Sequence, residues 1–277
     1  MSPTKNDLAL NSLNRGNFKD REFCNSFYSF RKWRTDNLSE KDGIVVGSDI
    51  TQEWLLPWWW EHYSRHNSYP VAFVDFGMSE EMKTWCKERG EWIFLGLADI
   101  FVAERQEIDP ALAEKMEGTH GKVIWTSRNA WFKKPLACLQ SPFRRSVWID
   151  LDCQIFGSIA KLFELCEPSL AMARELPPFH SVKANYNSGV IAFKHGISAI
   201  KTWADQSFTH NHEFTGDQDI LYTLIHEQKL DITEIPTIYN WSRSYPENKE
   251  AIILHWQGPQ GKSAIIHQIM RKHLEFF

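Results

Sequence analysis

The sequence contains no long apolar run and no excess of basic residues. No run approaches the roughly 18 apolar residues of a membrane-spanning helix, and the N-terminal stretch MSPTKNDLALNSLNRGNFKD contains no apolar segment of signal-peptide length. The formal net charge is −4, from 31 basic and 35 acidic residues, so the sequence predicts no polycationic surface of the kind that binds nucleic acid. We therefore expect a soluble protein without a nucleic-acid partner. A peripheral contact with a membrane is neither required nor excluded.

Cysteine is scarce and shows no pairing pattern. The five cysteines, none of them in a C-x-x-C pair or at zinc-type spacing, are Cys24, Cys86, Cys138, Cys153 and Cys166. An odd number without such spacing indicates reduced thiols. We expect no disulfide framework and a cytoplasmic location.

Tryptophan, by contrast, is abundant. Four of the thirteen lie in the short stretch WLLPWWW, at positions 54, 58, 59 and 60. Such a stretch is typical either of aromatic side chains at a membrane interface or of a half-buried helix whose rings pack in the core. We favour the core interpretation, with Pro57 beginning or kinking the helix.

The chain divides into a polar N-terminal segment and one α/β domain. Residues 1–42 are polar and irregular in pattern, which predicts a tail or lid rather than a domain. Over residues 43–277, strand-like runs alternate with helical patterns, and this alternation predicts a mainly parallel sheet with helices on both faces. The expected strands are 44–47, 71–76, 92–95, 147–150, 170–173, 190–193 and 252–254, and helices ending at Tyr63 and Glu88 follow the first two.

Two carboxylates follow one of these strands in the stretch RSVWIDLDC. Asp150 and Asp152 lie at the carboxyl end of the predicted strand, where ligands collect in parallel sheets. Unpaired carboxylates are costly to bury, and two oxygen ligands at this spacing suit Mg²⁺ or Mn²⁺. The alternative is a pair of solvated acids at a strand end. The neighbouring motifs are needed to distinguish a metal site from such a pair.

Further motifs accompany the acidic pair in a fixed order. They are VVGSD ending at Asp49, VDFGMSEEM from Val74, FKKPLACLQSPFRR before the pair, YNSGVIAF from Tyr186, GDQDILYTLI from Gly216 and ILHWQGP ending at Pro259. Together with the pair, over residues 43–260, they resemble the retaining, metal-dependent glycosyltransferases of family 8, which include glycogenin and bacterial lipopolysaccharide galactosyl- and glucosyltransferases. The resemblance implies a single domain of the GT-A fold over residues 43–277.

The resemblance also implies a metal site. Asp150, Asp152 and His255 would hold the Mn²⁺ or Mg²⁺ that bridges the diphosphate of a UDP-sugar. Gly258 and Lys262 match the family's H-x-x-G-x-x-K loop, in which the lysine contacts the diphosphate. The loop here, HWQGPQGK, is one residue longer than that pattern.

Other residues are implied to surround the donor. Those expected to contact its base, ribose, diphosphate or sugar are Asp49, Lys134 with Lys133 as a substitute, Asn187, Ser188 and Gly189. Asp217 and Gln218 match the family's catalytic positions beside the sugar hydroxyls and the anomeric carbon. For these two, the alternative is a role as simple helix N-terminal caps, where aspartate is favoured.

The resulting interpretation is a transferase that moves a hexose, glucose or galactose, from a UDP-sugar to an acceptor hydroxyl with retention of configuration. The acceptor, whether carbohydrate, lipid-linked or protein, is not indicated by the sequence. One alternative is a nucleotide-sugar-binding protein without turnover. Another is a sugar-phosphate nucleotidyltransferase, although VVGSDITQEW lacks the Gly-rich phosphate loop of that class. A haloacid-dehalogenase-type phosphatase is disfavoured because Gln154 stands where that class has Thr or Val.

Overall fold

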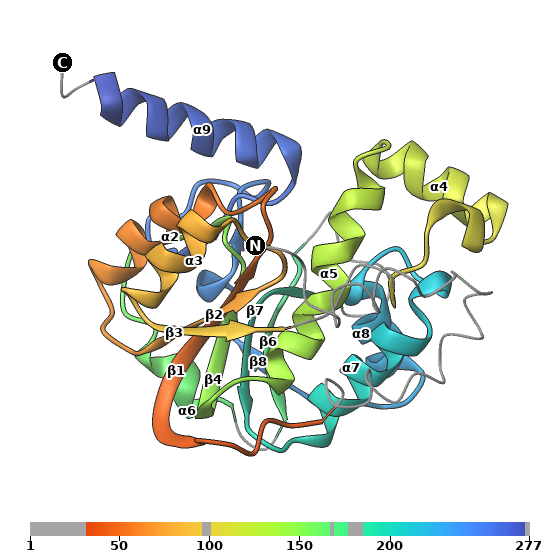
Figure 1. Ribbon diagram of the computed structural model, residues 1–277, viewed down its shortest axis with the longest axis horizontal. Helices are drawn as coiled ribbons and strands as arrows, with labels where there is room; N and C mark the ends of the chain where they lie inside the picture. Colours follow the sequence, from red (N-terminus) through yellow and green to blue (C-terminus); the bar gives the residue numbers. More distant parts are fainter. Residues whose placement is uncertain (1–31, 96–100, 167–168, 177–184, 275–277) are drawn as a thin grey trace, which may run out of the picture.

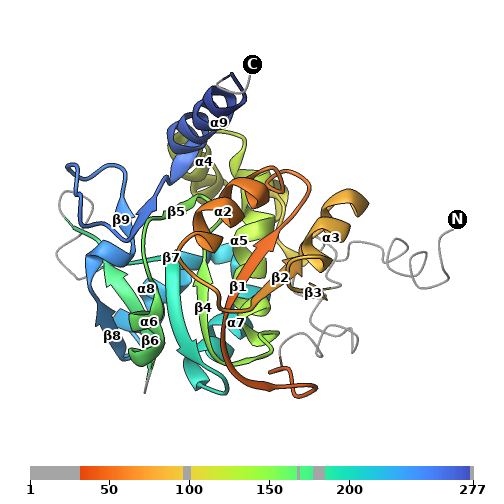
Figure 2. The ribbon, with the colours of Figure 1, turned by 90° about the vertical axis from the view of Figure 1, so that its left-hand side faces the viewer.

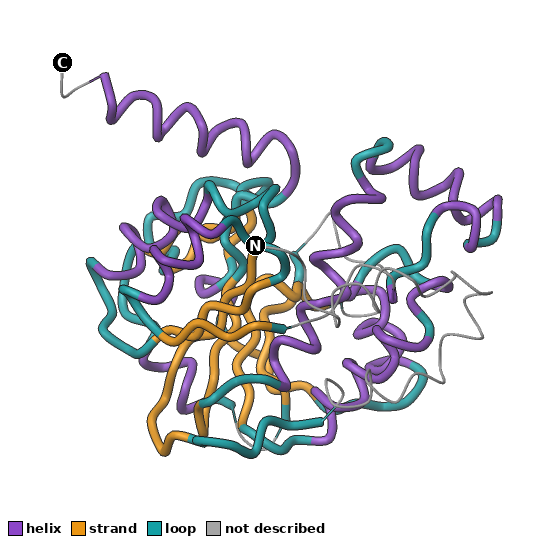
Figure 3. The backbone as a smooth tube through the Cα atoms, viewed as in Figure 1, coloured by secondary structure: helices purple, strands orange, loops and turns teal. Residues whose placement is uncertain are grey.

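A seven-stranded sheet runs through the middle of the protein, with helices on both sides (Figures 1 and 3). The computed structural model describes residues 32–95, 101–166, 169–176 and 185–274. In the order β3-β2-β1-β4-β7-β6-β8, neighbouring strands are parallel except that β7 is antiparallel to β4 and β6. The strands are β1 (Ser39–Ser48), β2 (Val71–Asp75), β3 (Glu91–Phe94), β4 (Phe143–Ile149), β6 (Leu170–Arg174), β7 (Tyr186–Lys194) and β8 (Ile232–Ile235). The predicted α/β fold with a mainly parallel sheet is confirmed.

A second, three-stranded sheet lies beside the first. Its order is β5-β10-β9, with β5 at Cys153–Ile155, β10 at Ile253–His255 and β9 at Trp241–Ser242. Strand β5 follows the acidic pair directly, and its Cys153 is paired with His255 of β10. This pairing brings a histidine from near the end of the chain next to the turn after β4.

Helices cover both faces of the main sheet because its strands are apolar on both sides. In β1, Val45 packs with helices α5, α7 and α8, whereas Ile44 and Val46 pack with α2, α3 and α6 on the opposite face. The helices are α2 (Leu55–Ser64), α3 (Glu80–Lys87), α4 (Pro110–His120), α5 (Ile124–Leu139), α6 (Ala160–Glu164), α7 (Ser198–Thr209), α8 (Asp217–His226) and α9 (Gly258–Leu274), with 3-10 turns at Arg105–Glu107, Asn211–Glu213 and Thr237–Tyr239.

The tryptophan-rich stretch forms α2 and packs in the core. Trp58 and Trp59 are 4% and 0% exposed, and the Trp59 ring stacks on Tyr63 with 4.9 Å between centroids. Pro57 lies in the first turn, where a missing backbone N–H leaves no intrahelical bond unmade. The core interpretation is confirmed for these two rings.

The N-terminal boundary differs from the expected one. β1 begins at Ser39, and Asp42 pairs with Arg145 of β4 both in the sheet register and through an ion pair of 2.6 Å. Residues 39–42 thus belong to the sheet, while residues 1–31 of the expected tail lie outside the described residues. Figure 2 shows the arrow of β1 pointing towards the end of the molecule from which α9 extends.

Two further properties concern the length of the helices and the state of the cysteines. Within the described ranges, no helix combines the length and apolar character needed to cross a membrane. The cysteines of those ranges, Cys86, Cys138, Cys153 and Cys166, are buried free thiols.

Candidate active site

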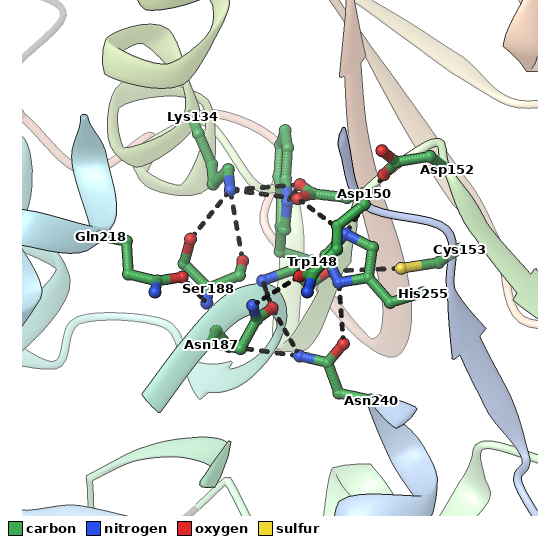
Figure 4. A network of polar contacts seen from close by, with 12 residues as sticks. Lys134, Trp148, Asp150, Asp152, Cys153, Asn187, Ser188, Gln218, Asn240 and His255 are labelled. Carbon is green, nitrogen blue, oxygen red and sulfur yellow. Dashed lines mark hydrogen bonds and ion pairs between the residues drawn. The ribbon is translucent and has the colours of Figure 1, made fainter. Parts of the chain in front are cut away.

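The candidate active site is centred on the turn between β4 and β5. Asp150 and Asp152 occupy this turn, and the Asp150 N–H donates to the Gly189 carbonyl of β7 at 2.8 Å. The Asp150 side chain is 24% exposed and that of Asp152 is 10% exposed. Both carboxylates therefore lie at the carboxyl end of β4, as predicted, in the network drawn in Figure 4.

A buried lysine from α5 joins three elements of the site. The Lys134 Nζ lies 3.2 Å from an oxygen of Asp150 and 3.2 Å from an oxygen of Asp217, and it donates to the Ser188 hydroxyl at 3.2 Å. Burial alone would lower the pKa of Lys134, but the two carboxylates outweigh it, so the pKa lies above its ordinary value. The neighbouring Lys133 instead donates to the Phe76 carbonyl at 2.9 Å.

Asp152 faces a second group of positive or polar side chains. Its carboxylate lies 3.0 Å from the Lys262 Nζ and 3.3 Å from the His255 Nε2. Burial would raise the pKa of Asp152, but Lys262 and His255 more than reverse this and hold it well below its usual range. The same imidazole nitrogen lies 4.0 Å from Asp150, so His255 faces both acids.

These groups fit a hard divalent cation. The ligand atoms that lie mutually within 4.8 Å belong to Asp152, Cys153 and His255, and Asp150 approaches the same face of the imidazole. Burial raises the pKa of the Cys153 thiol well above its usual value, and a soft sulfur is a poor ligand for a hard cation such as Mg²⁺ or Mn²⁺. Carboxylate oxygens and an imidazole nitrogen remain as the donor set, which suits Mn²⁺ or Mg²⁺.

Asp217 and Gln218 lie at the start of α8 and do not cap it. The capping side chain is that of Asp219, which accepts from the backbone N–H of Thr215 and Gly216. Asp217 accepts from the Ser188 hydroxyl at 3.0 Å, and the Gln218 Oε1 accepts from the Ser188 N–H at 3.0 Å. The alternative of simple helix caps is therefore wrong for these two residues, because both side chains contact Ser188 of β7, and Figure 4 shows Gln218 beside it.

The turn-like motif Asn187-Ser188-Gly189 is part of strand β7. A Cβ atom at Gly189 would lie 2.2 Å from the Cε1 of His255, so glycine is required for the imidazole to pack against β7. Gly189 was expected to allow close approach of the donor, and the structure shows a close approach of His255 at this position.

Asp49, Gly258 and Lys262 occupy the margins of the site. Asp49 follows β1, and its Oδ1 accepts from the N–H groups of Thr51 and Gln52, which forms the turn into α2. Gly258 has a φ of +83°, which favours glycine, and it begins α9. Lys262 lies on that helix, and its ion pair with Asp152 shows that the longer H-x-x-G-x-x-x-K loop still brings the lysine to the acidic pair.

Three residues of the network were not expected from the sequence. The Trp148 indole N–H donates to Asp150 at 2.6 Å, Asn240 contacts the Nδ1 of His255 at 3.0 Å, and Glu175 contacts Asn187 and Gln218. A weak signal existed for Trp148, because residues two apart in or next to a strand share a face. Asn240 and Glu175 carry no local signal, since they reach the site through connections between distant segments.

This arrangement, a mixed sheet of seven strands with an acidic turn and a polar cluster at one end, is the GT-A fold of glycosyltransferases. No model of a protein family and no curated protein matches the sequence. The chain is similar to the solved structure of the galactosyltransferase LgtC in complex with donor and acceptor sugar analogs, with a TM-score of 0.51, 14% identity and coverage of 79% of this chain and 87% of that one.

It is also similar to the glycosyltransferase GlyE in Streptococcus pneumoniae TIGR4, with a TM-score of 0.50, 18% identity and coverage of 84% of this chain and 65% of that one. A further similar structure is an active-site mutant of LgtC in which a glutamine is replaced by glutamate, with a TM-score of 0.51, 12% identity and coverage of 79% and 88%. At such identities these likenesses establish the fold.

Proposed function

We propose that this protein is a retaining glycosyltransferase that moves a hexose from a UDP-sugar to an acceptor hydroxyl. The observation that carries the proposal is the convergence of two polar clusters at the end of β4. One joins Lys134, Asp150 and Asp217, and the other joins Asp152, His255 and Lys262. The GT-A fold and the sugar-bound state of the LgtC structure support this choice of substrate class.

The metal-binding half of the site would act on the leaving group. Asp150, Asp152 and the Nε2 of His255 would hold Mn²⁺ or Mg²⁺, which supplies Lewis-acid stabilisation of the departing diphosphate. The two clusters together contain three carboxylates, two ammonium groups and one imidazole. One negative charge is therefore in excess when His255 is neutral. A cation is therefore favoured here, and Lys262 is available to donate to a phosphate oxygen.

The other half would orient and stabilise the sugar. Asp217 can accept hydrogen bonds from sugar hydroxyls, and Lys134 fixes its position. We assign the Gln218 amide oxygen to the side of the anomeric carbon, where it would steady positive charge in an oxocarbenium-like transition state. A neutral amide is a poor nucleophile, so we infer attack by the acceptor from the face that the diphosphate leaves, with a leaving phosphate oxygen taking the acceptor's proton.

The test is UDP release from a panel of UDP-glucose and UDP-galactose with Mn²⁺ or Mg²⁺, with and without EDTA and with a set of hydroxyl acceptors. The proposal predicts metal-dependent release, abolished by EDTA and restored by excess metal. Proton NMR of the product is expected to show an α-linked sugar from the α-linked donor. Binding of UDP and Mn²⁺ by calorimetry without turnover on any acceptor would favour a nucleotide-sugar-binding protein instead, and a sugar-phosphate nucleotidyltransferase would release diphosphate from a nucleoside triphosphate and a sugar phosphate.

A further inference from the structure

Helix α5 contacts the segment that leads into α8 at three successive points, and the two helices lie side by side in Figure 1. Arg128, Trp131 and Lys134 are three positions apart, so each is next to the following one on the helix surface. Lys134 contacts Asp217, and a Cβ atom at Gly216 would lie 3.0 Å from the Cε3 of Trp131. Arg128 contacts the residues before Gly216. One face of α5 therefore follows the chain from the turn before α8 into the site.

The Arg128 guanidinium binds the backbone of this turn. Its Nη1 donates to the carbonyls of Phe214 and, at 3.0 Å, Thr215. Its Nη2 donates to the Asn211 carbonyl at 2.9 Å. The side chain is fully buried, and burial lowers the pKa of Arg128 to about 10, which leaves the guanidinium charged at neutral pH. Three carbonyl groups of one turn thus share a buried positive charge.

The contribution of this charge is geometric. Within the described ranges of the chain, no carboxylate forms an ion pair with Arg128. A buried guanidinium without such a partner loses its hydration, and an apolar side chain of similar size would avoid that loss. What the guanidinium supplies is a planar fork of donors, which fixes several acceptors relative to one another. The turn is thereby held in one position against α5.

We propose that Arg128 is a positioning residue that fixes where Asp217 and Gln218 enter the site. The cap formed by Asp219 joins the first residues of α8 to one another, so it moves with the helix and does not tie it to α5. Lys134 contacts the side chain of Asp217, whereas Arg128 binds the backbone that precedes it. The inference rests on the proposed function for its kinetic consequences, but the position of the turn is a property of the protein without substrate.

The experiment compares Arg128→Met and Arg128→Lys in the full-length protein. Methionine can donate to none of the three carbonyls. A lysine ammonium can donate to them, although without the forked geometry. The matched control is Arg105→Met, because Arg105 is 52% exposed and pairs with Glu117 of α4 outside the site. Thermal melting of each variant gives the temperature at which all of them are folded, and kinetics are measured there.

UDP release from a UDP-sugar with an acceptor gives kcat. For Arg128→Met we expect kcat to fall about 10- to 100-fold, because a displacement of about 1 Å in a catalytic group can cost that much. The Kd of UDP should stay nearly unchanged, because Asp152, His255 and Lys262 lie on other elements. Arg128→Lys should recover part of kcat, and Arg105→Met should match the wild type. A residue that only stabilised the fold would change Tm and leave the kcat of the folded protein unaltered.

A second measurement needs no substrate. Trp203 of α7 is buried, and its indole N–H donates to the Asp217 carbonyl at 2.9 Å. Its signal in a proton–nitrogen-15 NMR spectrum, assigned with Trp203→Phe, therefore reports the position of Asp217. In Arg128→Met we expect this signal to shift and its hydrogen exchange to become at least about 10-fold faster. The change should be smaller in Arg128→Lys and absent in Arg105→Met.

A folded Arg128→Met protein with the kcat of the wild type would overturn the inference. An unchanged Trp203 signal in that variant would overturn it as well. If Arg128→Met does not fold, Arg128→Gln takes its place in both measurements under the same criteria. If the wild type transfers no sugar from any UDP-sugar, the proposed function fails, while the Trp203 signal still decides whether Arg128 positions Asp217.

Discussion

Replacing Lys134 by methionine removes an ammonium group that contacts both Asp150 and Asp217. The side chains of Lys134 and Asp217 are each 6% exposed, whereas that of Asp150 is 24% exposed and partly screened by solvent. Removing one partner of a buried ion pair costs about 3–5 kcal/mol, and the partial exposure of Asp150 favours the lower end. With roughly 2–4 °C of Tm per kcal/mol for a domain of this size, the Tm should fall by about 6–12 °C.

The loss should depend on pH with a defined sign. Burial, followed by the charge of Asp150, raises the pKa of Asp217 even though Lys134 opposes the shift. Without Lys134 that pKa rises further, and a carboxyl with a raised pKa destabilises the folded state above that pKa. The penalty is relieved as pH falls through the folded pKa towards the unfolded value of about 3.9. The difference in Tm between wild type and Lys134→Met should therefore shrink as the pH is lowered from neutral towards the unfolded pKa of about 3.9.

Differential scanning calorimetry over this pH range measures the effect. The second substitution Asp217→Asn in the Lys134→Met background serves as the matched control, because it removes the uncompensated carboxylate and should return part of the lost Tm. A Lys134→Met protein whose Tm matches the wild type at every pH would refute the reasoning, as would a difference that grows on acidification.

Three further predictions concern the ligand sites. Asp152→Asn should weaken Mn²⁺ binding at least about 10-fold in calorimetry, and unchanged affinity would place the metal elsewhere. Lys262→Met should strengthen metal binding in the absence of nucleotide, because the lysine competes with the metal for Asp152. The same substitution should weaken UDP binding. Weaker binding of both metal and UDP would contradict this competition. Gln218→Ala should lower kcat about 100-fold and leave the Kd of UDP nearly unchanged, because the lost interaction exists mainly in the transition state. A similar loss of UDP affinity would assign Gln218 to ground-state binding.

Six of the seven strands of the main sheet were predicted, because their apolar runs are short and are separated by polar turns, whereas β8 (Ile232–Ile235) was not. Helix α5, which carries Lys134, was not predicted. Its sequence IWTSRNAWFKKPLACL includes Pro135 and three buried cations, Arg128, Lys133 and Lys134. Buried charges remove the contrast between a polar and an apolar face on which helix prediction depends. The contacts that stabilise them come from distant segments, such as the backbone carbonyls of residues 211, 214 and 215 around Arg128.

The site residues were predicted from the resemblance to family 8, whereas Asn240 and Glu175, which contact them, were not predicted. The acidic pair stands out in the sequence because two carboxylates end an apolar run. Asn240 and Glu175 are of common residue types in unremarkable surroundings, and they meet the site only because β9 and β10 pair and because the β6–β7 register shifts. Such contacts depend on tertiary register, which local patterns do not encode.

The two lysines of the site carry the same charge in different settings. Lys134 is 6% exposed and lies between two carboxylates, so displacing it would leave Asp217 buried and unpaired. Lys262 is 33% exposed and forms an ion pair with Asp152. A cation or phosphate that enters the site can replace the second ion pair at much lower cost in desolvation than the first. We therefore infer that ligand binding breaks the ion pair between Lys262 and Asp152, whereas Lys134 keeps its contacts with Asp150 and Asp217.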